Sequence, residues 1–216
     1  MTTAEAWHAT DRLLPLGDAA DGTWIAERTV RDLLTRAALN VRGVAPGRPG
    51  FHLADDGARS SVPVPPGGLP PGELRITMEL AAVADRPLPQ LTGRLRAALL
   101  DVAEGTLGLA VAGVDLRVTE LLDTAPDRTP PPPPRSRTSP PAPGDPAALT
   151  ALTVPGVAAL TDAFGPPLQR TPAHVRIEVA VTTGHRALTV ARALRTALAE
   201  AAPDGPEVTV LISEFH

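Results

Sequence analysis

A proline-rich segment divides the chain into two parts. Residues 124–146 read TAPDRTPPPPPRSRTSPPAPGDP, and ten of these 23 residues are proline. Proline lacks a backbone N–H donor and has a fixed φ, so the segment cannot join a helix or a sheet ladder. We therefore expect an extended linker of polyproline character between a first unit, residues 1–123, and a second unit, residues 147–216.

The first unit alternates helix patterns with strand patterns. Apolar residues recur at helical spacing over residues 25–39 and 88–102, with arginine and acidic residues on the opposite face. Residues 74–80 and 114–121 alternate apolar and polar residues, as strands with one buried face do. Residues 63–72 are rich in proline and glycine and are expected to form a loop.

The second unit repeats this order in a shorter form. A strand pattern at 175–181, a helix pattern at 188–198 and a closing strand pattern at 208–215 follow one another. Val41-Arg42-Gly43-Val44 also resembles Val154-Pro155-Gly156-Val157. These matches indicate an internal duplication with a truncated second copy. The predicted fold class is α+β, with two small related α/β units, each a small sheet packed by helices.

Composition excludes several classes of function. The net charge of −4 argues against nucleic-acid binding, which needs a basic face. The chain has no cysteine and no lysine, which rules out thiol catalysis, disulfides, Schiff-base chemistry and a lysine-dependent phosphate loop. The first residues do not form a signal peptide, and no window reads as a membrane-spanning helix. We expect a soluble cytoplasmic protein that is not an enzyme and has no cofactor.

The motifs of the first unit resemble the alkaline shock protein family of bacterial envelope-stress proteins. The similarity rests on residues 22–26, Val41-Arg42-Gly43-Val44, the strand at 74–83, Leu88-Pro89 before the long helix, and the closing strand at 111–118. It covers residues 22–122 and, more weakly, 147–215. The resemblance implies a small α+β fold without enzymatic activity, attached to the cytoplasmic face of the membrane through a partner protein. The proline linker and the second unit depart from the family pattern.

Two segments carry candidate binding chemistry. His185 and Arg186 stand where a strand meets a helix, a position at which free helix amides bind anions, so an ordinary loop and a phosphate or carboxylate site are both open readings. His52 with Asp55 and Asp56 imitates a weak metal site, but the run Asp55-Asp56-Gly57 favours a turn between two short strands.

A partner protein has its own candidate contacts. The prolines at 130–134 with the basic residues after them are either a polyproline ligand or a plain spacer. Trp7 lies in a predicted helical arm, residues 4–14, whereas Trp24 is expected at the start of the first helix, in the core. The residues assigned to partner binding are Trp7, Pro131, Pro133, Arg135 and Arg137.

The sequence leaves three hypotheses for the function. The leading hypothesis is a non-catalytic scaffold or adaptor of the envelope-stress type, recruited to the cytoplasmic membrane face by a protein partner. The alternative is a small-ligand or anion-binding module that uses the loop Gly184-His185-Arg186. Nucleic-acid binding ranks last because the sequence has no basic stripe. Whether copies of the chain associate is left open.

Overall fold

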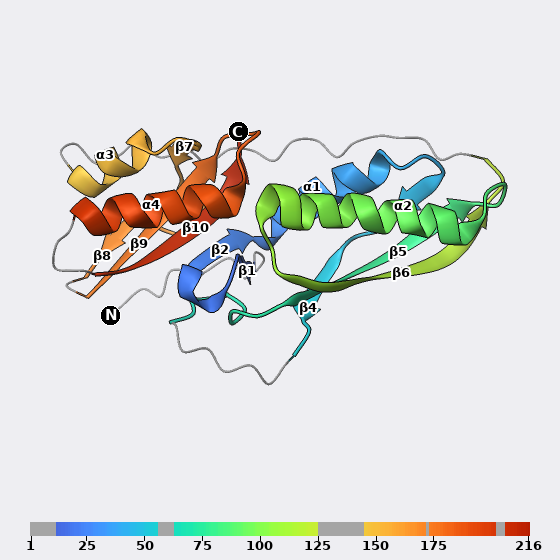
Figure 1. Cartoon of the computed structure of the whole chain (residues 1–216), viewed down its shortest axis with the longest axis horizontal. Helices are drawn as coiled ribbons and strands as arrows, with labels where there is room; N and C mark the ends of the chain where they lie inside the picture. The colour runs from blue at the N-terminus through green and yellow to red at the C-terminus, as the bar shows by residue number, and fades with distance from the viewer. Residues whose placement is uncertain (1–11, 56–62, 125–144, 172, 202–205) are drawn as a thin grey trace, which may run out of the picture.

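The computed structural model describes residues 12–55, 63–124, 145–171, 173–201 and 206–216. It has four helices and two mixed sheets of six and four strands, each packed with helices, so the predicted α+β class is confirmed (Figure 1). The two sheets lie at opposite ends of the long axis of the molecule. No helix within the described ranges is long and apolar enough to cross a membrane.

The first unit builds the four-stranded sheet, with two helices on its inner face. The segments with helical spacing, 25–39 and 88–102, contain the two helices, and the alternating segments, 74–80 and 114–121, lie in the two long strands. In chain order the elements are α1 (Glu27–Leu39), β3 (Val44–Pro46), β4 (Gly50–Leu53), β5 (Leu74–Val83), α2 (Leu88–Leu100), a π-helical extension of α2 (Asp101–Leu107) and β6 (Val111–Leu122).

The second unit has the same order of elements. These are α3 (Pro146–Thr153), β7 (Val157–Leu160), β8 (Leu168–Arg170), β9 (His174–Val181), α4 (Ala187–Ala201) and β10 (Glu207–Phe215). Its first helix has 8 residues where α1 has 13, in line with the predicted truncation.

Strand pairing repeats as well as order. In the first unit β3 and β4 pair antiparallel with one edge of β5, and β6 pairs parallel with the other edge. In the second unit β7 and β8 pair antiparallel with one edge of β9, and β10 pairs parallel with the other. The two halves therefore share one topology, as an internal duplication requires.

The N-terminal hairpin joins the sheet of the second unit. Strands β1 (Leu13–Pro15) and β2 (Thr23–Ala26) pair with each other, and β2 pairs parallel with β10. The prediction that a helix starts at Ile25 was wrong, because Trp24 and Ile25 lie in β2 and α1 starts at Glu27. Of the predicted helical arm, residues 4–11 lie outside the described part of the chain, and the residues that follow enter β1. The span assigned to the first unit thus supplies two strands to the second sheet.

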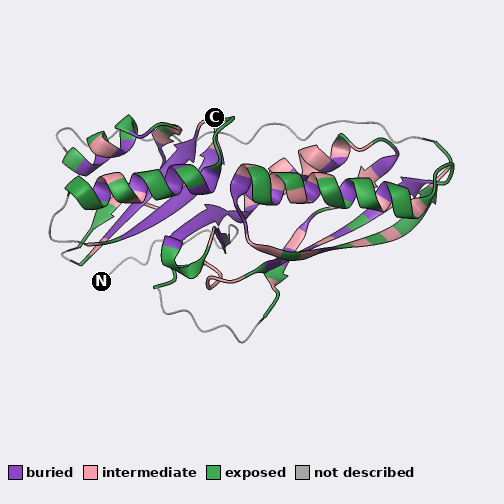
Figure 2. Cartoon of the chain, in the orientation of Figure 1, coloured by how far each residue is buried: buried purple, intermediate pink, exposed green. Residues whose placement is uncertain are grey.

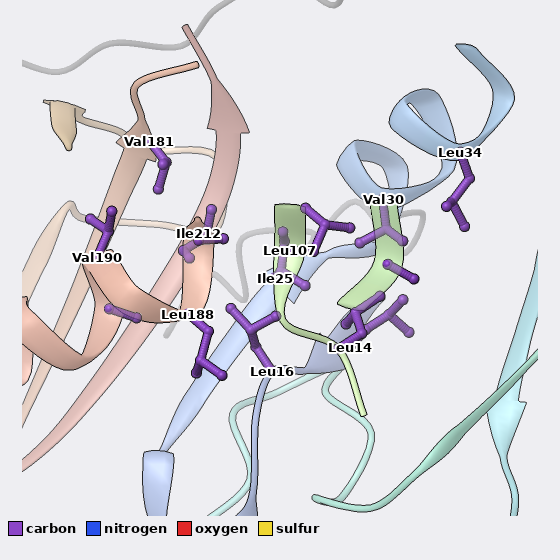
Figure 3. Packing of buried hydrophobic residues seen from close by; sticks show 14 of the residues in the cluster. Leu14, Leu16, Ile25, Val30, Leu34, Leu107, Val181, Leu188, Val190 and Ile212 are labelled. Carbon is purple, nitrogen blue, oxygen red and sulfur yellow. The ribbon is translucent and has the colours of Figure 1, made fainter. Parts of the chain in front are cut away.

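One continuous hydrophobic core runs through both units. It includes Ile25 from the hairpin, Leu107 from the end of α2, and Leu188 and Ile212 from the second unit. Figure 3 shows Ile25 and Leu107 between Ile212 of the second unit and Val30 of α1. Because burying one such side chain is worth about 1.5–3 kcal/mol, this shared core fixes the two units to each other.

Candidate functional site

The outer face of the second sheet holds a buried polar cluster. The carboxylate of Glu178, on β9, accepts hydrogen bonds from the backbone N–H groups of Ala163 (2.7 Å) and Phe164 (2.9 Å) and from the hydroxyl of Thr161 (2.9 Å). The Thr161 hydroxyl also lies 2.6 Å from the hydroxyl of Ser213, on β10. The cluster holds the loop after β7 against the sheet.

Burial changes the proton affinity of this cluster. Glu178 is fully buried, and the loss of water raises its pKa, although its three hydrogen bonds and the nearby Arg176 act in the opposite direction. Burial likewise lowers the pKa of Arg176 against the pull of Glu178. Nη2 of Arg176 donates to the carbonyl of Phe164 (3.0 Å), while the buried Nε of Arg176 has no hydrogen-bond partner.

A small apolar cluster completes the cover of this face. Leu13, Trp24 and Leu211 are buried together, with Phe164 packed against them. The indole Nε1 of Trp24 donates to the carbonyl of Leu69 (2.9 Å), so the proline- and glycine-rich loop of the first unit lies over the second sheet. Trp24 is a core residue, as predicted. These contacts stabilise the fold and leave the face closed.

The predicted anion-binding loop makes structural contacts. Nε and Nη2 of Arg186 both donate to the carbonyl of Glu104, at 3.2 and 3.1 Å. The ring of His185 lies against Gly156, where an added Cβ would stand 2.9 Å from His185 Cδ2. Arg186 thus ties α4 to the end of α2, and anion binding at this loop stays a prediction.

The other predicted site residues fall into two groups. His52 lies in β4, and no group of three or more His, Asp or Glu side chains within the described ranges is placed to hold a metal ion. The predicted partner contacts lie outside the described residues, in the segments 1–11 and 125–144; they are Trp7, Pro131, Pro133, Arg135 and Arg137.

An ion pair ties the N-terminal hairpin to α4. Arg192 donates from Nε to Asp21 Oδ1 (2.6 Å) and from Nη2 to Asp21 Oδ2 (2.9 Å). Burial by itself would raise the pKa of Asp21, but the hydrogen bonds and the charge of Arg192 hold it below its usual value. The hairpin is therefore fixed on the second unit by charge as well as by strand pairing.

The closing strands of the two units differ in what covers their outer edges. In the second unit β2 pairs with the outer edge of β10, β1 pairs with β2, and the backbone of residues 67–69 bonds to β1. In the first unit no described strand pairs with the outer edge of β6, although β6 has 12 residues. Figure 2 shows the contrast: β9 and β10 are buried along most of their length, whereas β6, apart from Val114, is half-buried or exposed.

Hydrogen bonding on β5 identifies the open groups on β6. The backbone carbonyl of Glu79 accepts a hydrogen bond from the loop after β3, so the backbone N–H and C=O groups of Glu79 point to the β3 side of β5. Because these groups alternate along a strand, those of Met78 point to β6. In a parallel ladder a residue bonds to the two neighbours of the residue opposite it, and Met78 stands opposite Leu116. Leu116, and by alternation Val114 and Val118, therefore direct their backbone N–H and C=O groups to the open edge. The carbonyl of Val114 is not free, because it accepts a hydrogen bond from Nε of Arg96, on α2 (3.2 Å).

The two faces of β6 carry different side chains. On the outer face Asp115 pairs with Arg75 (3.1 Å) and Arg117 with Glu79 (3.5 Å), both across to β5. On the inner face, the side that α2 covers, are Val114, Leu116 and Val118, of which Val114 is buried and the other two are half-buried. The sequence predicted this strand and its alternation but gave no signal that its edge is open.

Searches against family models, curated proteins and solved structures found no match to this chain.

Proposed function

We propose that this chain is a non-catalytic scaffold or adaptor protein that binds a protein partner through the open edge of β6. The observation that carries the proposal is the difference between two related units: β10 has its outer edge covered by β2, and β6 does not. An extended segment added to such an edge gains backbone hydrogen bonds, and the side chains on either face select the partner.

The resemblance to the alkaline shock protein family supports a binding role rather than an enzymatic one. Under this proposal the protein belongs to an envelope-stress system and reaches the cytoplasmic face of the membrane through its partner. The first unit, which carries the motifs of the resemblance, is also the unit with the open edge. The predicted proline ligand in the linker would then be a second contact with a partner.

Proline at the edge tests the proposal. Because the N–H of Val118 points to the open edge, Val118→Pro removes no hydrogen bond to β5, and edge strands tolerate proline. It does remove a donor that an added strand would use. The matched control is Leu149→Lys, which changes an exposed leucine on α3 of the second unit.

The measurement is an affinity purification of the tagged protein from its native cells, with cytosol and detergent-extracted membranes analysed separately. A partner retained by the wild type and by Leu149→Lys but lost with Val118→Pro is the expected result. An unchanged set of partners with Val118→Pro, with folding confirmed by circular dichroism, would contradict the proposal. Turnover of a substrate by the purified protein would contradict its non-catalytic part.

A further inference from the structure

We infer that the strand which pairs with the open edge of β6 is β6 of a second copy of this chain, antiparallel about a two-fold axis at Leu116. The inference rests on the proposed function, since it names the occupant of the same edge in the free protein, which a partner strand would displace. Its basis is that the edge is complementary to itself in backbone groups, apolar side chains and charge.

The backbone defines a short regular segment for this pairing. The register of β6 with β5 is irregular between Val111 and Gly113 and again between Val118 and Glu120, so residues 113–118 form one uninterrupted stretch. About an axis at Leu116, the two copies of Leu116 face each other, and Val114 faces Val118 of the second copy. All three residues direct their N–H and C=O groups to the edge, as hydrogen-bonded antiparallel pairs require. The carbonyl of Val114 accepts from Nε of Arg96 (3.2 Å) and has a second lone pair for the N–H of Val118 of the second copy.

Charge on the outer face selects the same register. With the axis at Leu116, Asp115 stands opposite Arg117 of the second copy, and symmetry gives this contact twice. It is a non-hydrogen-bonded pair, in which Cα atoms stand about 4.5 Å apart and side chains interact most closely. Since Arg117 also pairs with Glu79 in its own chain, charges of alternating sign would continue from one sheet into the other.

Neighbouring registers lose this complementarity. An axis at Val114 places Arg117 opposite Val111, and an axis at Val118 places it opposite Thr119, so neither forms an ion pair. An axis at Asp115 places Asp115 opposite itself, and an axis at Arg117 places Arg117 opposite itself, so both bring like charges together. The inner face agrees with the axis at Leu116, because Val114, Leu116 and Val118 are all apolar and carry none of the inward charges that protect sheet edges.

Charge reversal tests the register directly. The purified full-length chain should sediment as a dimer of 2 × 22.4 = 44.8 kDa. Asp115→Arg and Arg117→Asp each place like charges opposite one another twice, which should weaken the dimer about tenfold. The double variant Asp115→Arg/Arg117→Asp restores opposite charges between the copies and should recover most of the lost affinity, although its new side chains meet like charges at Arg75 and Glu79 of their own chain. Arg170→Glu is the control, because it reverses a charge in an ion pair with Asp145 in the second unit, away from β6.

Cross-linking gives an independent measurement. The chain has no cysteine, so Leu116→Cys introduces a single thiol. At the axis the two thiols are close enough for a short bis-maleimide to join them, and the cross-linked dimer should form in high yield. Leu149→Cys, on the exposed face of α3, should remain monomeric on denaturing gels.

Three results would overturn the inference: a monomer at all concentrations, a dimer that the double charge reversal does not restore, or equal cross-linking at positions 116 and 149. Proposed function and inference can fail separately. If the protein is a monomer but Val118→Pro still removes a cellular partner, the edge binds another protein and the inference alone is wrong. If the dimer forms in the expected register but Val118→Pro leaves all cellular partners in place, the adaptor role at this edge is wrong and self-pairing stands.

Discussion

Gly108 is the position where a single methyl group should separate the two units. It ends the π-helical extension of α2 with φ +90° and ψ 29°, and its carbonyl accepts from the N–H of Gly17 (3.2 Å). A Cβ at Gly108 would stand 2.6 Å from Cβ of Leu188 and 3.1 Å from Nη2 of Arg186. Cβ of Leu188 does not move when its side chain rotates, so α2 and α4 must shift apart in Gly108→Ala.

Two costs add in this variant. Left-handed backbone costs a non-glycine residue about 1–2 kcal/mol. Forcing a methyl group into a packed contact costs about 1–3 kcal/mol more. We therefore expect Gly108→Ala to lower the free energy of unfolding by about 2–5 kcal/mol, a large part of the stability of an ordinary domain.

Two other glycines separate these costs. Gly184 has nearly the same φ, +92°, but a Cβ there would meet nothing within 4 Å, so Gly184→Ala should show the backbone cost alone. Gly93 lies within α2 and also has nothing within 4 Å, so Gly93→Ala should raise stability by about 0.5–1 kcal/mol. Urea unfolding followed by circular dichroism measures all four proteins. If Gly108→Ala loses no more than Gly184→Ala, the close contact between α2 and α4 is refuted.

Three further substitutions probe the second sheet by urea unfolding. Replacing Glu178 with alanine leaves the partly buried N–H groups of Ala163 and Phe164 without an acceptor and should cost about 2–4 kcal/mol at low pH. Because burial raises the pKa of Glu178, the stability it contributes is lost as the pH rises through that value, so the difference in unfolding free energy from the wild type should shrink. A difference that grows with pH would contradict this. Asp21→Asn should lower the free energy of unfolding by only about 1 kcal/mol at neutral pH, because Arg192 is half-exposed and solvent screens the ion pair. This loss should vanish as the pH falls through the lowered pKa of Asp21. A loss that persists in acid would exclude the ion pair as its cause. Trp24→Phe leaves the carbonyl of Leu69 without its donor and should cost about 1–3 kcal/mol, whereas no loss would mean that the hydrogen bond contributes nothing.

The long elements were predictable because their signals are local. The strand patterns at 74–80 in β5 and 175–181 in β9 alternate over seven residues, and α1 and α2 show helical spacing over several turns. The repeat of these patterns was enough to predict two related units. Strand β2 was missed because four residues before a helix look like its first turn, and the strand that pairs with them is β10, at the other end of the chain.

The candidate sites were harder to predict because they depend on what covers a strand. Glu178 lies on the polar side of an alternating strand, which the sequence predicts to face solvent. In the structure a loop closes over that side, and its N–H groups hold the carboxylate. The open edge of β6 has the same character, since its availability follows from the hairpin covering the other unit.

The hairpin that crosses to the second sheet also determines when the protein can finish folding. The hydroxyl of Thr29 donates to the carbonyl of Ser213, 184 residues further along the chain. At about 5–20 residues per second, a ribosome needs roughly 10–40 s to make the chain between them. Within that interval β2, which carries Trp24, has β1 to pair with but lacks β10. The edge of β2 that β10 covers in the folded protein is therefore exposed during synthesis, and a chaperone that binds nascent chains would have this edge as a target until β10 is made.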